Sequence, residues 1–478
     1  MYTAVIMIVA YMVITTLISF YFSRKTDSAE SYYVADRKLS TGMIIAMLFS
    51  EFIAGAGTVG NAASAFNGGL SSVWANWGMA IGCFMFVPFV GRFYHAMAVS
   101  KGAMSIPECF RLFYDKRTHI LLIAIIVLVY IMIYSTQAIA AASVIAPLLG
   151  VNPLLITWIV TFLFIAVTLF GGMEGIAWMN VLHSIVMYLG MFLVAFVALR
   201  SVGGMDTLRA ALPEKYFSFA QPNLSTIMAS ALGTGLSFLA AANVTNGCFC
   251  AKSAKASNRG IILAGMLCIP FALAPAIIGI CARVAVPAAG SNSVLYTMAN
   301  FLGSGYGGII STAIIAAIYS PGLLLIICTV LTKDLFKGYV APHATEKQQL
   351  LFTKVLVVAV GVISTIVGLH ADSILDQMLG AFQIRSVVGI VLAVSLFWPR
   401  VSKDAAFWSM LGGGAVAVVW QFSGRPFGIS TLWPAAAVCL MILIPMTLFG
   451  KEKISPGYRM YKEALKRTRE IELDAPPS

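Results

Sequence analysis

The sequence predicts an all-α membrane protein, and three observations support this class. Hydrophobic residues make up 60% of the 478 residues and charged residues only 10%, unlike a soluble globular domain. Apolar runs of about 20 residues, the length that crosses a bilayer as a helix, recur through the chain. These runs lack the short alternating segments of a membrane β-barrel. We therefore expect a multi-pass bundle of helices.

About thirteen of these runs have the length and polarity of membrane spans. Approximately, they cover residues 3–22, 41–66, 73–97, 118–146, 152–171, 175–199, 224–247, 260–285, 306–335, 352–371, 374–398, 404–422 and 430–449. The first run has no basic segment before it and no small-residue cleavage pattern. We therefore expect it to be a retained helix rather than a signal peptide.

The net charge of +12 does not indicate a nucleic-acid partner, because the basic residues follow the membrane topology. If the spans alternate in direction, most of the 31 Lys and Arg residues fall in the loops of one side. Cytoplasmic loops carry such an excess of positive charge. This places the N-terminus outside and the C-terminus inside, in a cell (inner or plasma) membrane.

Enzyme and metalloprotein classes receive little support. The eight cysteines are scattered, and Cys248 and Cys250 form an isolated C-x-C with no second pair nearby. The sequence shows no arrangement of nucleophile and base, and no phosphate-binding loop. We predict neither an enzyme nor a resident cofactor, and Na⁺ enters only as a candidate coupling ion.

The second span carries the most informative polar residue. Glu51 lies about 15 Å from the start of a helix beginning at Thr41, which is near the middle of the bilayer. A carboxylate at this depth is costly and indicates a functional site. Gly55 and Gly57 follow it, and Gly233 to Gly235 lie in the span five later. Interrupted helices at matching positions of two halves point to the binding site of a secondary transporter.

Several segments resemble the sodium:solute symporter family. The segment from Thr168 to Gly190, TLFGGMEGIAWMNVLHSIVMYLG, is similar to the family signature, a Gly-Gly-Met turn followed by a helix start. Four further segments resemble family landmarks in unbroken order: SIPECFRLFYD from Ser105, CAKSAKASNRGIILAG from Cys250, AAIYSPGLLLIICTVLTKDLF from Ala316 and SLFWPR from Ser395.

The resemblance implies a LeuT-like core of two inverted repeats of five helices, which moves its solute by alternating access. The implied regions are a peripheral helix and loop in 1–40, repeats in 41–199 and 200–399, two peripheral helices in 400–450, and a cytoplasmic tail in 451–478.

The resemblance also implies a sodium site between the break of the second span and the ninth span. Its carbonyl ligands map onto Ser50 and Ile53, and its ninth-span ligands onto Leu325, Cys328 and Thr329. Oxygen atoms suit a hard cation, whereas the Cys328 thiol does not, so only Thr329 keeps a suitable hydroxyl. Asn180 also departs from the family, since many members have an acidic residue there.

Glu51 and Arg385 are the two charges expected deepest in the membrane, and three interpretations remain open. They could form a buried pair that is structural or gating. Arg385 could instead bind a substrate carboxylate with two nitrogens. In the third interpretation Glu51 is a proton site and transport is proton-coupled.

We therefore expect an ion-coupled symporter that imports a small polar, carboxylate-bearing solute. A proton-coupled or ion-independent carrier of the same fold is the alternative, and a non-transporting membrane solute sensor is less favoured. Glu51, Asn180 and Arg385 are the coupling or gating candidates. The candidate substrate-binding residues are Gly55, Gly57, Thr136, Gln137, Ser237, Phe238 and Arg385.

Overall fold

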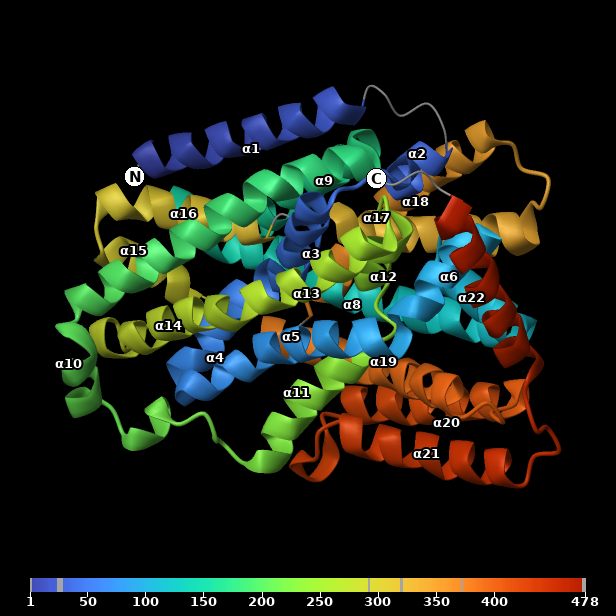
Figure 1. Ribbon diagram of the computed structural model, residues 1–478. Helices are drawn as coiled ribbons and strands as arrows, with labels where there is room; N and C mark the ends of the chain where they lie inside the picture. Colours follow the sequence, from blue (N-terminus) through green and yellow to red (C-terminus); the bar gives the residue numbers. More distant parts are fainter. Residues whose placement is uncertain (1, 24–28, 291–292, 319–320, 371–372, 475–478) are drawn as a thin grey trace.

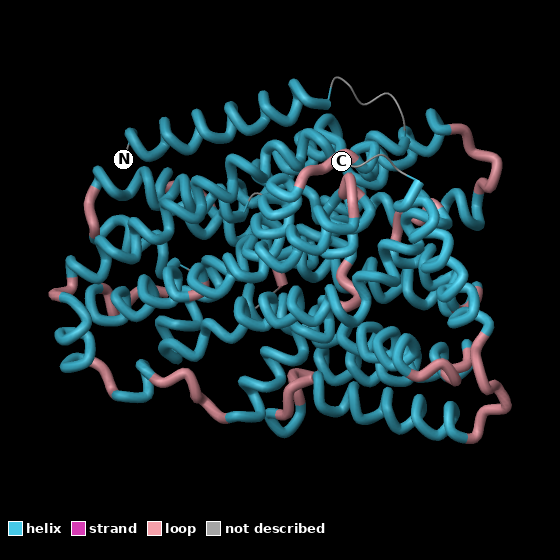
Figure 2. Tube along the Cα trace, viewed as in Figure 1, coloured by secondary structure: helices cyan, strands magenta, loops and turns pink. Residues whose placement is uncertain are grey.

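The computed structural model describes residues 2–23, 29–290, 293–318, 321–370 and 373–474. Within these ranges the chain is helical, with short loops and no strand (Figure 2). The longest helices are α1 (Tyr2–Ser23), α8 (Lys116–Leu149), α9 (Pro153–Ser201), α13 (Ala254–Phe271), α18 (Glu346–Gly368), α19 (Ile374–Phe397), α20 (Lys403–Phe422), α21 (Leu432–Leu448) and α22 (Pro456–Asp474).

Shorter elements complete the bundle. They are α2 (Ala29–Val34), α3 (Thr41–Gly55), the π-helical η2 (Ala56–Gly60), α4 (Asn61–Gly68), α5 (Trp74–Phe86), α6 (Arg92–Lys101), α7 (Ile106–Phe113), α10 (Gly204–Ala211), η5 (Glu214–Phe217), α11 (Leu224–Phe238), α12 (Ala242–Phe249), α14 (Leu273–Ala285), α15 (Val294–Phe301), α16 (Ser304–Ile318), α17 (Pro321–Val330) and the π-helical η7 (Leu331–Val340).

Most long helices run side by side along the bundle (Figure 1). Helix α22 instead crosses one end of it, packed on α6 and α7. We call this end the α22 end, and the opposite end, where α10 lies, the α10 end. Helix α1 packs on α9 and α16, and α20 and α21 pack on each other and on α19.

Eight helices in the described ranges are long and apolar enough to cross a membrane, and three shorter apolar helices accompany them. One of the eight, Thr41–Lys101, contains two of the expected spans. The expected ninth span includes residues 319 and 320, which lie outside the described residues. The number of thirteen spans and the domain boundaries therefore stay predictions.

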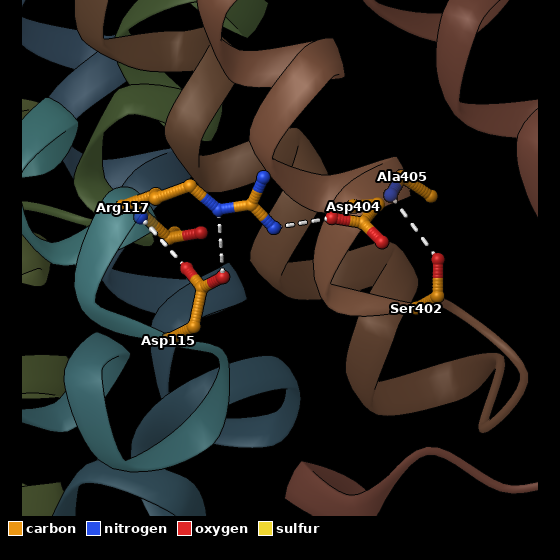
Figure 3. Close-up of polar contacts among 6 residues, drawn as sticks. Asp115, Arg117, Ser402, Asp404 and Ala405 are labelled. Carbon is orange, nitrogen blue, oxygen red and sulfur yellow. Dashed lines mark hydrogen bonds and ion pairs between the residues drawn. The ribbon is translucent and has the colours of Figure 1, made fainter.

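Local sequence explains why helix α8 begins and ends where it does. The Asp115 carboxylate accepts a hydrogen bond from the Thr118 backbone N–H at 2.9 Å, which caps the first turn. The helix ends at Gly150, whose φ of +67° lies in the left-handed region that glycine tolerates. At the same end as Asp115, Arg117 binds Asp404 of α20 at 2.5 Å (Figure 3).

Two long helices are interrupted inside the bundle. In α3 the interruption is at Ala54, whose φ of +40° and ψ of −159° are not helical. The second span is thus broken as predicted, but at Ala54, one residue before the glycines of the predicted segment. The prediction for Gly233 to Gly235 is wrong, since α11 runs through them to Phe238 and the chain turns at Leu239 to Ala241. The backbone N–H groups of Leu239, Ala240 and Ala241 hydrogen-bond to carbonyls of the last turn of α11. The turn therefore forms without glycine.

Candidate substrate and ion site

The first break is stabilised by amide side chains from neighbouring helices. The backbone N–H of Gly55 donates to Gln137 Oε1 of α8 at 3.0 Å. The Gly57 carbonyl accepts from Asn76 Nδ2 of α5 at 3.1 Å. These partners matter because an unpaired backbone group inside a membrane is expensive. A Cβ at Gly55 would lie 2.7 Å from Ala140 Cβ, so glycine lets α8 approach.

The second break is stabilised by its own turn and by a tyrosine. Leu239, Ala240 and Ala241 donate backbone bonds back to the last turn of α11, at 3.1–3.2 Å. The Tyr130 hydroxyl of α8 accepts from the Asn243 backbone N–H at 3.0 Å and donates to Asn243 Oδ1 at 2.9 Å. Helix α8 therefore supports both breaks, with Gln137 at one and Tyr130 at the other.

Arg385 lies beside the second break and is 1% exposed. Its Nε donates to Ser237 Oγ at 2.8 Å. The guanidinium carbon lies 5.2 Å from the ring centre of Tyr130 and 5.4 Å from that of Phe382, within cation–π range. Both terminal nitrogens are buried and make no hydrogen bond in the described structure. A buried guanidinium with two open donors can receive a carboxylate bidentately.

Glu51 is 4% exposed and lies on the other side of this region. Its Oε2 is buried and has no hydrogen-bond partner among the described residues. A Cβ on Gly322 would lie 2.1 Å from Glu51 Oε1, so glycine at the start of α17 lets the carboxylate occupy this position.

The two midplane charges do not pair within the part of the chain that the structure describes. Arg385 bonds Ser237, whereas Glu51 faces Gly322. The prediction of a Glu51–Arg385 pair is therefore wrong for this structure. Tyr130 lies beside Arg385, with its ring centre 5.2 Å from the guanidinium carbon. The separation leaves an acidic and a basic side chain, each with open polar atoms, inside the bundle.

Aromatic rings form the wall beside Arg385. The Phe238 ring lies 4.9 Å from that of Phe52 and 5.8 Å from that of Phe382. Phe238 thereby contacts the residue next to Glu51 and the residue one turn before Arg385. Of the predicted substrate residues, Ser237, Phe238 and Arg385 come together at this wall.

Other predicted substrate residues make structural bonds. Gln137 uses its oxygen on Gly55 and donates from Nε2 to the Ile133 carbonyl at 3.2 Å. The Thr136 hydroxyl donates to the same carbonyl at 2.8 Å. Gly55 and Gly57 lie at the first break, against α8 and α5. These four residues shape the break next to the site.

The candidate ion ligands lie in the buried parts of α3 and α17. Ser50 Oγ is buried without a hydrogen-bond partner, and Ile53 immediately precedes the break at Ala54. The Thr329 hydroxyl donates to the Leu325 carbonyl at 2.8 Å, which leaves its lone pairs open. The Cys328 thiol is fully buried.

Asn180 is a further open polar group. Both of its amide atoms are buried and have no hydrogen-bond partner among the described residues. Such a group usually finds a partner inside a protein. An amide oxygen can coordinate a cation, which keeps Asn180 a candidate for ion passage.

Tyr130 is a residue that the sequence reasoning missed. It lies seven residues before Gln137 on α8, and positions i and i+7 share one face of a helix. The polar residues Thr136 and Gln137 therefore pointed to Tyr130, which lies about two turns earlier on the same face of the helix as Gln137. Gly322 could not have been found this way, because its role depends on where the Glu51 side chain lies.

A cavity of about 570 Å³ opens at the α10 end of the bundle. Gly60, Asn67, Lys215 and Asp376 are among its lining residues, so it reaches the helical segment just beyond the first break. On the opposite side of the site, a cavity of only about 10 Å³ lies between α12 and α17. The wide cavity at the α10 end therefore approaches the site from that end.

Known proteins resemble the chain over nearly its full length. A proline transporter of Bacillus subtilis, OpuE, is 22% identical and matches 96% of this chain and 98% of its own length. The sodium/proline symporter of Escherichia coli is 23% identical, over 94% of this chain and 93% of its own. The sodium/glucose cotransporter of Vibrio parahaemolyticus is 24% identical, over 83% and 80%.

Solved structures show the same fold. A Na⁺-coupled sialic acid symporter in a substrate-bound outward-open state superposes with a TM-score of 0.78 at 17% identity, covering 93% of this chain and 97% of its own. MhsT in complex with L-phenylalanine gives a TM-score of 0.56 at 15% identity, covering 84% and 97%. The all-α, LeuT-like fold class is therefore confirmed.

The family model for the sodium:solute symporters matches residues 32–413, most of the chain. That range contains both breaks, Glu51, Arg385 and Thr329. The chain belongs to the sodium:solute symporter family, whose members are membrane transporters of small solutes and not enzymes.

Proposed function

We propose that this chain is a Na⁺-coupled symporter that imports a small, carboxylate-bearing solute by alternating access. The observation that carries the proposal is Arg385, whose two terminal nitrogens are buried and unpartnered. Burying an open guanidinium costs free energy, and a ligand carboxylate would recover part of it. The Ser237 bond at Nε fixes the plane of the group, so both open nitrogens face the same ligand.

The solute site lies between Arg385 and the first break. The rings of Tyr130, Phe238 and Phe382 surround its apolar part, and the carboxylate binds Arg385. Relatives named for proline, and one structure named for sialic acid, carry or bind solutes that bear a carboxylate. These names support the chemical class rather than one solute.

The ion enters from the side of the first break. Ser50 and Ile53 supply backbone carbonyls there, Thr329 supplies a hydroxyl, and Asn180 lines the route of the ion. Glu51 supplies a carboxylate to a set of ligands that is otherwise neutral. Its open Oε2 also supports a second candidate, proton coupling, in which Glu51 rather than a sodium ion carries the charge.

The proposed orientation follows the charges. The α22 end carries most of the basic loops and is cytoplasmic, and the wide cavity at the α10 end faces outward in a cell membrane. The structure then corresponds to an outward-facing state. Closing that cavity and opening the α22 end completes the cycle.

The test is flux into proteoliposomes that contain the purified protein. Radiolabelled proline, other small carboxylates and their amides are offered under a Na⁺ gradient or a pH gradient. We expect accumulation of a carboxylate but not of its amide, and only with Na⁺. If uptake is unchanged when Na⁺ is replaced by another cation and instead follows the pH gradient, sodium coupling is rejected. Glu51 would then be the proton site.

Arg385→Gln tests the carboxylate contact. Its loss removes a charged, bidentate bond, so we expect the KM of the solute to rise by about 100-fold or more. Arg385→Lys keeps the positive charge but cannot bind a carboxylate with two nitrogens, so it should recover only part of the affinity. Arg209→Gln, on exposed α10, is the matched control and should transport normally. An unchanged KM in Arg385→Gln excludes direct contact.

A further inference from the structure

A second buried polar cluster lies at the α22 end, away from the site above. The Ser105 hydroxyl donates to Asp334 Oδ1 at 2.9 Å, and His119 Nε2 lies 3.2 Å from the same oxygen. His119 Nδ1 in turn lies 2.6 Å from the Tyr339 hydroxyl. Three segments thus meet at one carboxylate: the N-cap of α7, the first turn of α8 and η7.

The carboxylate is only half satisfied. Asp334 is 5% exposed and His119 1% exposed. Asp334 Oδ2 is buried with no hydrogen-bond partner in the described structure. No Lys or Arg side chain of the described residues forms an ion pair with it, although Arg111 acts on it from a distance. An unpaired buried carboxylate oxygen is costly, so its retention calls for a ligand.

The free oxygen of the carboxylate determines which ligand fits. Oδ1 receives the Ser105 hydroxyl and lies beside His119 Nε2, whereas Oδ2 has no partner among the described residues. Carboxylate oxygens are preferred ligands of hard cations. Oδ2 is therefore the open position for a cation.

A path joins this carboxylate to the ion site. Thr329 and Ser105 both line the small cavity between α12 and α17. Thr245 and Asn246 of α12 add a hydroxyl and an amide to its walls. Ser105 in turn donates to Asp334 Oδ1 at 2.9 Å. Oxygen atoms therefore continue from Thr329 through Ser105 to Asp334.

We propose that Asp334 and Ser105 form a transit site for a monovalent cation, Na⁺, on its way from the Thr329 site to the α22 end. His119 is its positioning residue, since its Nε2 lies 3.2 Å from Oδ1 while Oδ2 stays without a partner among the described residues. The site rests on the proposed sodium coupling and adds a second stop for the ion. Its carboxylate supplies an acidic group that Asn180 lacks.

The experiment uses the full-length chain in proteoliposomes loaded with unlabelled NaCl, with ²²Na⁺ outside. In parallel, ²²Na⁺ binding to the purified protein in detergent measures equilibrium affinity. For Asp334→Asn we expect exchange about tenfold or more below wild type, because a transit charge is lost, with binding affinity at the main site within about twofold. Asp334→Glu keeps the charge and should recover most of the exchange.

Asp404→Asn is the matched control. This aspartate also lies near the α22 end and binds a cation, Arg117, but its side chain is 50% exposed (Figure 3). It should exchange ²²Na⁺ as wild type does. Wild-type exchange in Asp334→Asn overturns the transit site, and so does an equal loss in Asp334→Asn and Asp334→Glu. A wild-type protein that neither binds nor exchanges ²²Na⁺ would instead overturn the proposed sodium coupling itself.

Discussion

The two interrupted helices solve the same physical problem in different ways. At the first break a single residue, Ala54, leaves the helical path, and the freed Gly55 N–H depends on the Gln137 side chain of another helix. At the second break three residues turn, and their N–H groups bond within the turn itself. Tyr130 adds bonds only at Asn243, beyond the turn.

This difference indicates which break can move. A break that depends on side chains of α8 and α5 stays formed only while α3 keeps its position relative to both helices. A break that closes its own bonds can travel as a unit with α11 and α12. We therefore expect the first break to change when the neighbouring helices move. The second break should keep its shape and so hold Ser237 beside Arg385.

Gln137→Leu is the variant with the largest expected effect on the difference between the two breaks. It leaves the buried Gly55 N–H without an acceptor, which costs about 1–3 kcal/mol, more than an ordinary surface change. We expect a clearly lower melting temperature in detergent and uptake at least about tenfold below wild type. Gln377→Leu is the control, since that amide bonds α8 at Met132 and Ser135 and makes no bond to either break. Equal losses in the two variants would remove the special role of Gln137.

Tyr130→Phe should have a smaller effect. The variant loses the hydroxyl bonds to Asn243, but the backbone turn stays bonded and the ring stays over Arg385. We expect a stability loss of about 1 kcal/mol and an uptake reduction of several-fold, measured beside Gln137→Leu. A loss larger than that of Gln137→Leu would show that the second break is not self-sufficient.

The comparison also separates what sequence could predict from what it could not. The glycines after Glu51 predicted a break in this segment, but the non-helical angles fall on Ala54, while Gly55 and Gly57 stay helical. Their missing Cβ atoms instead let α8 and α5 pack close to the break. The second break has no glycine at Leu239 to Ala241, so its position depends on tertiary packing. The depth of Glu51 and Arg385 followed from helix length alone, but their separation depends on Gly322 and Ser237, which lie far away in the sequence.

Glu108→Gln has the smallest expected effect. It tests the segment around Met104 and Ser105, which lines the small cavity together with α12. Glu108 Oε2 accepts from the Met104 N–H at 3.0 Å, and Met104 lines the small cavity together with Thr245 of α12. Burial raises the pKa of the Glu108 carboxyl above its ordinary value, and Asp334 adds to the increase. The folded state therefore holds this proton more tightly than the unfolded chain does, so stability present at low pH is lost as pH rises through the raised pKa.

Glutamine keeps an oxygen for Met104 but has no charge to bury. The melting temperature of Glu108→Gln should therefore equal that of wild type near pH 4.5 and exceed it by about 1–2 °C at pH 8, since well under 1 kcal/mol is involved. Thermal unfolding in detergent across this pH range measures the difference. A variant that loses stability equally at every pH would show that Glu108 acts through its bonds and not its charge. The loop around Ser105 would then be no more sensitive to pH than the self-bonded turn it packs beside.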